Sequence, residues 1–129
     1  MSGLLICSDI HGDAISAKKV IEAFERHGAE RLVILGDILY HGPRNDLPEG
    51  YAPKKVIEIL NPYSDKILAV RGNCEAEVDQ MVLTFPVLAD YAFIERDTEE
   101  KPRELKCIFH SGGKRYSDSD SLESMPRII

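Results

Sequence analysis

Three short polar motifs each follow an apolar run, and all three carry side chains that can bind a metal ion. The first, "SDIHGD", places Asp9 two residues before His11. The second ends at Asp37 in "LGD", and the third ends at Asn73 in "RGN". Carboxylate, imidazole and amide donors suit divalent ions such as Mn²⁺, Fe²⁺ or Zn²⁺ better than soft copper. The motifs therefore indicate a metal site if they meet in space.

Each motif also has an ordinary structural interpretation. An aspartate after a parallel strand is common as a helix cap, and a Gly-Asn pair commonly forms a turn. What favours the metal hypothesis is the position of all three motifs at the ends of successive apolar runs. If these runs are parallel strands, their carboxyl ends open onto one edge of the sheet, where ligands bind.

The apolar runs have the character of buried strands. Residues 4–8, 31–36 and 66–70 are short and almost continuously apolar, which is typical of strands covered on both faces. Helices are predicted between them, near 13–27 and 53–61, from apolar residues at helical spacing. The alternation of strand and helix predicts a parallel sheet with right-handed crossovers.

The helix ends carry the expected signals, and weaker patterns follow the third strand. Asp13 can cap the first helix, Gly28 follows its end, and Pro53 begins the second. The segment "EAEVDQMVL" predicts a short helix, and "YAFIE" and "LKCIF" predict two strands of a hairpin. Residues 111–129 show neither the alternation typical of strands nor the helical spacing of apolar residues, and they are rich in Ser and Asp. We therefore expect a poorly ordered tail there.

Composition narrows the class of protein. A chain of 129 residues with 43% hydrophobic and 29% charged residues predicts one soluble α/β domain. The net charge of −6 argues against nucleic-acid binding, and no apolar window is long enough for a membrane span. Cys7, Cys74 and Cys107 are widely spaced, which argues against a disulfide framework. The lack of a disulfide framework is typical of a reducing compartment, and the first strand begins too close to Met1 to leave room for a signal peptide. Both features predict a cytoplasmic protein.

The order D-x-H, GD, GN and a later histidine resembles the motif series of the calcineurin-like metallophosphoesterase superfamily. The stretches "SDIHG", "LVILGDILYHGPRNDLPEGYAP" and "AVRGNCEAEVDQM" are similar to the YfcE-type bacterial phosphodiesterases, and the resemblance covers residues 1 to about 90. It implies an α/β/β/α sandwich, present here largely as the N-terminal parallel βαβαβ half with a truncated second sheet.

The resemblance also implies an enzyme, a metal-dependent phosphodiesterase acting on small phosphodiesters. It implies two divalent ions, most typically Mn²⁺, with Zn, Fe, Ni or Mg as possibilities. Asp9 and His11 would bind the first ion, Asp37 would bridge both, and Asn73 and His110 would bind the second; the first four would also be the catalytic residues. A metal-bound hydroxide would attack the phosphorus.

Three further residues are candidates for substrate binding. Cys74 follows the Gly-Asn pair, where most of the superfamily has a histidine. A neutral thiol is a poor acid, so we expect activated or diester substrates whose leaving group needs little protonation. His41 and Arg44 lie on the loop after Asp37. Arg44 could pair with a phosphate oxygen, and an ordinary solvated loop charge is an equal alternative.

The resemblance weakens toward the end of the chain. Family members carry a later G-H-x-H motif that completes both metal sites, and this sequence shows none after His110. We therefore expect an incomplete phosphoesterase domain over 1–110, an aberrant tail over 111–129, and impaired activity. The alternative is a catalytically impaired remnant that binds metal or a partner. Apolar residues between Val87 and Phe109 would lack a covering layer, which predicts a homo-oligomer.

Overall fold

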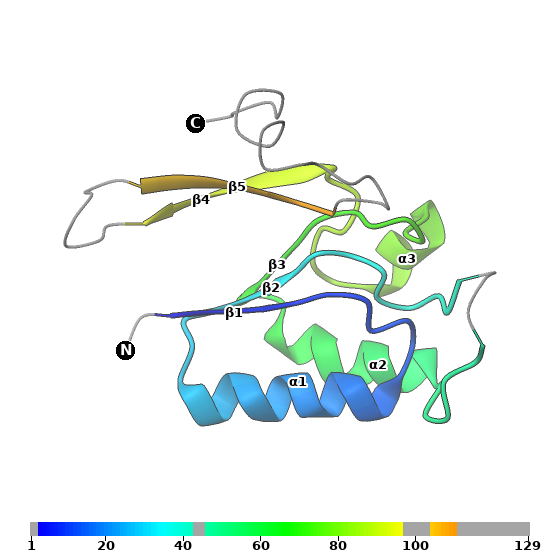
Figure 1. The fold of residues 1–129 in the computed structure, drawn as a ribbon. Coiled ribbons are helices and arrows are strands. Elements are labelled where there is room, and N and C mark those ends of the chain that lie inside the picture. Colours follow the sequence, from blue (N-terminus) through cyan, green and yellow to red (C-terminus); the bar gives the residue numbers. More distant parts are fainter. Residues whose placement is uncertain (1–2, 43–45, 97–103, 111–129) are drawn as a thin grey trace.

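The structure, a computed structural model, describes residues 3–42, 46–96 and 104–110. The predictions made for Arg44 and for the tail over 111–129 lie outside these residues. The described part of the chain forms two layers of strands with helices packed beneath the first of them (Figure 1).

The first layer is the predicted parallel sheet. Its strands are β1 (Leu4–Cys7), β2 (Arg31–Ile34) and β3 (Ile67–Ala69), in the order β1-β2-β3. In the parallel register, Leu5 pairs with Leu32, and Leu32 pairs with Ile67. The prediction of three parallel strands joined by helices is confirmed.

Helices α1 (Ala14–His27) and α2 (Pro53–Leu60) cover one face of this sheet (Figure 1). The Asp13 carboxylate caps α1 by accepting the Ile15 backbone N–H at 3.0 Å, which satisfies a donor that the helix itself leaves unpaired. Gly28 ends the helix in the left-handed conformation, and Pro53 stands at the start of α2. The predicted helix boundaries are therefore confirmed. A short 3₁₀-helix, η1 (Asn61–Tyr63), follows α2.

Strand β2 lies at the centre of the sheet and is covered on both faces. Leu32 and Ile34 pack into the core shared with the helices, while Val33 points to the opposite face, and all three are fully buried. The prediction of the same burial for β1 is wrong, because Ile6 is 54% exposed. As the edge strand, β1 buries Leu5 and Cys7 partly against the core, and its other face is not covered at Ile6 among the described residues.

The remaining elements follow β3. Helix α3 (Glu77–Val82) is short, and β4 (Tyr91–Arg96) pairs antiparallel with β5 (Glu104–Phe109), as predicted. Figure 1 shows this hairpin on the face of the parallel sheet opposite α1 and α2. The sequence predicts an uncovered apolar face between Val87 and Phe109. This is wrong for Val87, which is fully buried in the core, whereas Tyr91 is 49% exposed. Within the described residues, each helix falls short of the length and apolarity that crossing a membrane requires.

Candidate metal centre

The loops that leave β1 and β2 are joined by backbone hydrogen bonds beyond the ends of the strands. The Asp9 N–H donates to the Gly36 carbonyl at 3.1 Å, and the His11 N–H donates to the Asp37 carbonyl at 2.8 Å. The Gly12 N–H continues the series with a 2.7 Å bond to the Ile38 carbonyl. The two loops therefore bring their polar side chains to the same edge of the sheet.

These loops bend sharply at the candidate ligands themselves. In the described part of the chain, the non-glycine residues with positive φ are Asp9 at 60°, His11 at 50° and Asp37 at 55°. Side chains rarely adopt this left-handed conformation, and such strain tends to concentrate at functional sites. The chain therefore turns away from the direction of the strands at three of the residues that are expected to bind the metal.

Close backbone contact brings the loop after β3 to the same place. A Cβ atom on Gly36, which has φ of +95°, would lie 2.2 Å from the Gly72 nitrogen. A Cβ atom on Gly72 would lie 2.5 Å from Oδ1 of Asp37. Only residues without a side chain allow the second and third loops to approach this closely.

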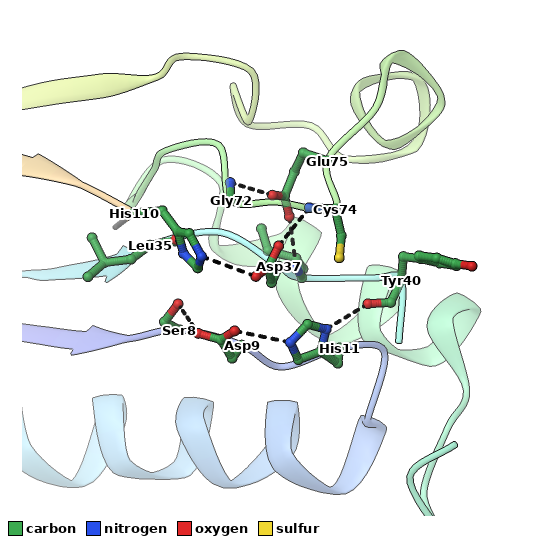
Figure 2. A network of polar contacts seen from close by, with 11 residues as sticks. Ser8, Asp9, His11, Leu35, Asp37, Tyr40, Gly72, Cys74, Glu75 and His110 are labelled. Carbon is green, nitrogen blue, oxygen red and sulfur yellow. Dashed lines mark hydrogen bonds and ion pairs between the residues drawn. The ribbon is translucent and has the colours of Figure 1, made fainter. Parts of the chain in front are cut away.

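Three side chains from three segments form a cluster at this edge. Asp9, Asp37 and His110 each offer one ligand atom, and these atoms lie within 4.8 Å of one another (Figure 2). His110 Nε2 is 3.3 Å from Oδ2 of Asp37, and His11 Nε2 is 3.0 Å from Oδ1 of Asp9. Of the five residues proposed as metal ligands, the structure brings Asp9, His11, Asp37 and His110 together here, and the cluster does not include Asn73. Asp37 is 2% exposed and faces the cluster instead of capping a helix.

Both histidines are oriented as metal ligands usually are. His11 Nδ1 lies 2.8 Å from the Tyr40 carbonyl, and His110 Nδ1 lies 2.7 Å from the Leu35 carbonyl. A carbonyl oxygen can only accept, so Nδ1 carries a proton in each ring, and Nε2, which faces a carboxylate oxygen, is the nitrogen left to bind a metal ion. This arrangement fixes the imidazole tautomer for metal binding, and the donor set fits a divalent ion.

The electrostatics of the first pair favour its charged forms. Burial alone would raise the pKa of Asp9, but hydrogen bonds with Ser8, His11 and the Asp37 carboxyl group outweigh burial and hold it below the ordinary value of 3.8. Burial alone would lower the pKa of His11, but the Tyr40 carbonyl and Asp9 raise it above 6.5. A site that keeps one carboxylate ionised at neutral pH attracts cations.

Asn73 and Cys74 lie on the third loop, next to Asp37. The Cys74 backbone N–H donates to Oδ1 of Asp37 at 2.8 Å, and Asn73 precedes it as an exposed residue. Burial, followed by the charge of Asp37, raises the pKa of the Cys74 thiol to about 11. At neutral pH the thiol is therefore protonated, which argues against a nucleophilic role.

His41 is half-buried and belongs to a group of aromatic rings. Its ring centre lies 4.9 Å from that of Tyr40 and 5.4 Å from that of Tyr51. The structure thus places His41 on the loop after the cluster, packed against rings, and its role in substrate binding remains a prediction.

Sequence reasoning missed Glu75, which fixes two of the loops to each other. Its carboxylate is 3% exposed and accepts the Ile38 N–H at 2.8 Å and the Gly72 N–H at 2.6 Å (Figure 2). These donors belong to the residue after Asp37 and the residue before Asn73. In the sequence Glu75 resembles a solvated turn residue, because one of its partners lies 37 positions away.

Comparison with known protein families gives a match over most of the chain. A model of the calcineurin-like phosphoesterases matches residues 3–126. Phosphodiesterase YfcE of Escherichia coli strain K12 is 57% identical over 91 residues, which are 70% of this chain and 50% of the relative. The same protein of Escherichia coli O157:H7 matches equally. The chain spans about half the length of the curated relatives that it matches.

A solved structure agrees with the sequence comparison. The structure of Yfce, described as a phosphoesterase from E. coli, is similar with a TM-score of 0.69 and 56% sequence identity. The similarity covers 70% of this chain and 50% of that one. The predicted fold class, an α/β fold of the metallophosphoesterase type, is therefore confirmed.

Proposed function

This chain belongs to the calcineurin-like phosphoesterase family, and we propose that it hydrolyses small phosphodiesters with a dinuclear metal centre. The observation that carries the proposal is the paired orientation of His11 and His110. Each ring is held by a backbone carbonyl on Nδ1 and faces a carboxylate with Nε2. Family membership supports divalent ions, and we propose Mn²⁺ as the native metal.

The position of each candidate ligand in the cluster indicates the role that we propose for it in metal binding. Asp9 and His11 would hold one ion and His110 and Asn73 the other, with Asp37 shared between them as in the family motif; Oδ2 of Asp37 faces His110 Nε2, and its Oδ1 accepts the Cys74 N–H. Bound ions would supply a hydroxide nucleophile and neutralise charge on the phosphoryl group. The Cys74 backbone N–H orients Asp37 through its hydrogen bond to Oδ1.

The chemistry of Cys74 supports a preference for substrates with good leaving groups. With a thiol pKa of about 11, this side chain is a weaker acid than the histidine usual at this place. The leaving alkoxide would then gain little from proton donation by Cys74. Phosphodiesters of acidic alcohols such as phenols should be hydrolysed faster than those of ordinary aliphatic alcohols.

The direct test is hydrolysis of an aryl phosphodiester with and without Mn²⁺. We expect release of the phenol to depend on Mn²⁺ and to stop when EDTA removes the metal. Asp37→Asn should abolish activity, because it removes the charge that both ions share. Asp65→Asn is the matched control, since Asp65 is an exposed carboxylate outside the cluster and its loss should leave the rate unchanged. Full activity in Asp37→Asn would refute the proposal.

A second candidate, a metal- or partner-binding protein with impaired catalysis, rests on the exposed apolar side chains of the sheets. Ile6 on β1 and Tyr91 on β4 are each about half exposed, which supports association with a second copy of the chain. We propose that residues 1–110 form the phosphoesterase domain and that it is a homo-oligomer in the cytoplasm. Light scattering at high micromolar concentration tests the oligomer, and a monodisperse monomer would contradict it.

A further inference from the structure

A cavity of about 540 Å³ opens beside the candidate metal centre. It lies between the loop after β2, helix α2 and helix α3, and its lining includes Tyr51, Ile57, Val78 and Val82. Its volume falls within the usual range for small-molecule sites in proteins. No residue that the sequence analysis proposed as a metal ligand lines it.

Two residues that line the cavity form backbone hydrogen bonds with candidate metal ligands. The Tyr40 carbonyl accepts from His11 Nδ1, and the Cys74 N–H donates to Asp37 Oδ1. Figure 2 shows the Cys74 sulfur turned toward the side of the site on which Tyr40 lies. The cavity is therefore a direct neighbour of the cluster on the side of Tyr40 and Cys74, and an ester group of a phosphodiester held at the cluster could extend toward it.

The lining determines which kind of ester group fits. Most of it is aliphatic or aromatic, including the rings of Tyr40 and Tyr51. Asp79 also lines the cavity, but its carboxylate already accepts the Ala76 N–H at 2.9 Å as part of the start of α3. Lys54 is the positively charged member of the lining and is itself exposed to solvent. Flat aromatic groups stack well on such rings, whereas an anionic group would lose hydration and lie beside the Asp79 carboxylate.

We infer that this cavity binds an uncharged aromatic ester group of the phosphodiester. The inference rests on the proposed function, because it takes the position of the phosphoryl group from the candidate metal centre. It goes beyond that function by naming the chemical class of the substrate and the surface that selects it.

Helix α3 offers a variant and a matched control. Val78 lines the cavity and is 62% exposed, so Val78→Asp places a charge in the cavity without disturbing the core. Met81 lies on the same helix, is 82% exposed and does not line the cavity. Met81→Asp therefore makes the same change of charge outside the proposed site.

The test uses methyl-labelled protein with Mg²⁺ and three probes followed by NMR: phenol, phenylphosphonate and methylphosphonate. We expect phenol at millimolar concentration to shift the methyl signals of Ile57, Val78 and Val82. Phenylphosphonate should bind at least about tenfold more tightly than methylphosphonate. Val78→Asp should remove this difference, and Met81→Asp should preserve it.

The outcomes separate this inference from the proposed function. If phenol leaves the three methyl signals unchanged, the inference is wrong, whatever the phosphonates do. If phenol binds in the cavity but neither phosphonate binds, the aromatic site stands and the phosphodiesterase proposal fails. If the same methyl signals shift with protein concentration alone and light scattering shows a dimer, the cavity is an interface between copies and the inference is overturned.

Discussion

Replacing Glu75 with glutamine tests whether the metal centre depends on a residue that is not itself a ligand. The carboxylate accepts one N–H from the loop after β2 and one from the loop after β3, at 2.8 and 2.6 Å. A glutamine of the same shape keeps one accepting oxygen and presents an NH₂ group to the other donor. One buried N–H therefore loses its partner and faces a second donor.

The size of the effect follows from these two bonds. Leaving one buried backbone donor unsatisfied costs about 1–3 kcal/mol of the free energy of unfolding. The loops joined by Glu75 carry Asp37 and Asn73, so their separation should also weaken metal binding. Changes in groups that orient metal ligands typically reduce affinity by about 10–100-fold. We expect Glu75→Gln to fold and to bind Mn²⁺ within this range of weakening.

The assay pairs two measurements on each variant. Urea denaturation without metal gives the change in stability, and the EPR signal of free Mn²⁺ gives the affinity. Asp79→Asn is the matched control, because Asp79 is also a buried carboxylate that accepts a backbone N–H, that of Ala76 three residues before it, so this bond does not connect two different loops. The hydrogen bond from the Ala76 N–H can pass to the amide oxygen, so stability and Mn²⁺ affinity should both stay near those of the unmodified chain.

A purely structural role for Glu75 would give a different pair of results. Glu75→Gln would then lower stability while its Mn²⁺ affinity stayed equal to that of the unmodified chain and of Asp79→Asn. That outcome would refute the reasoning, since it would show that the ligands keep their positions when the connection between the loops is weakened.

Three further predictions concern metal binding, backbone contact and pH. An EPR titration should show at most one tightly bound Mn²⁺, because five candidate protein ligands leave two ions short of donors; two ions bound at nanomolar strength would contradict this. Gly36→Ala should cost about 3–5 kcal/mol in urea denaturation, since its φ is +95° and its Cβ would meet backbone, whereas Gly28→Ala, with open space around it, should cost only about 1–2 kcal/mol. The hydrogen bond to Glu25 raises the pKa of Tyr63 above 10.0, so its stabilising effect should persist below pH 10 and disappear as pH rises through the raised value. An NMR titration checks this, and Glu25→Gln should return the Tyr63 pKa to its ordinary range.

The parallel sheet and its helices could be predicted because their signals are local. Apolar runs of strand length and apolar residues at helical spacing depend only on neighbouring positions, as do the caps at Asp13 and Gly28. Burial of β1 was predicted wrongly because the apolar run does not reveal which strand lies at the edge. Ile6 is as apolar as Val33, but only Val33, on the central strand, is covered.

The site was predictable to the extent that its ligands follow strands. Asp9, His11 and Asp37 are placed by the ends of two parallel strands, so the sheet edge brings them together without further information. Glu75 and the cavity depend on contacts between loops and helices that no period encodes. A buried glutamate in a turn becomes recognisable only when the two backbone donors that it satisfies are known.

Strain and charge are concentrated at the same few residues, and the rest of the fold holds them there. Three non-glycine residues of the site adopt the left-handed conformation, and two of them bring carboxylates within 4.8 Å of each other. Both features are unfavourable for an isolated chain. The backbone ladder between the first two loops and the buried Glu75 between the second and third resist their relaxation. A cation placed among Asp9, Asp37 and His110 would offset the cost of holding two carboxyl groups this close, so the features that cost stability without metal are the ones that favour metal binding.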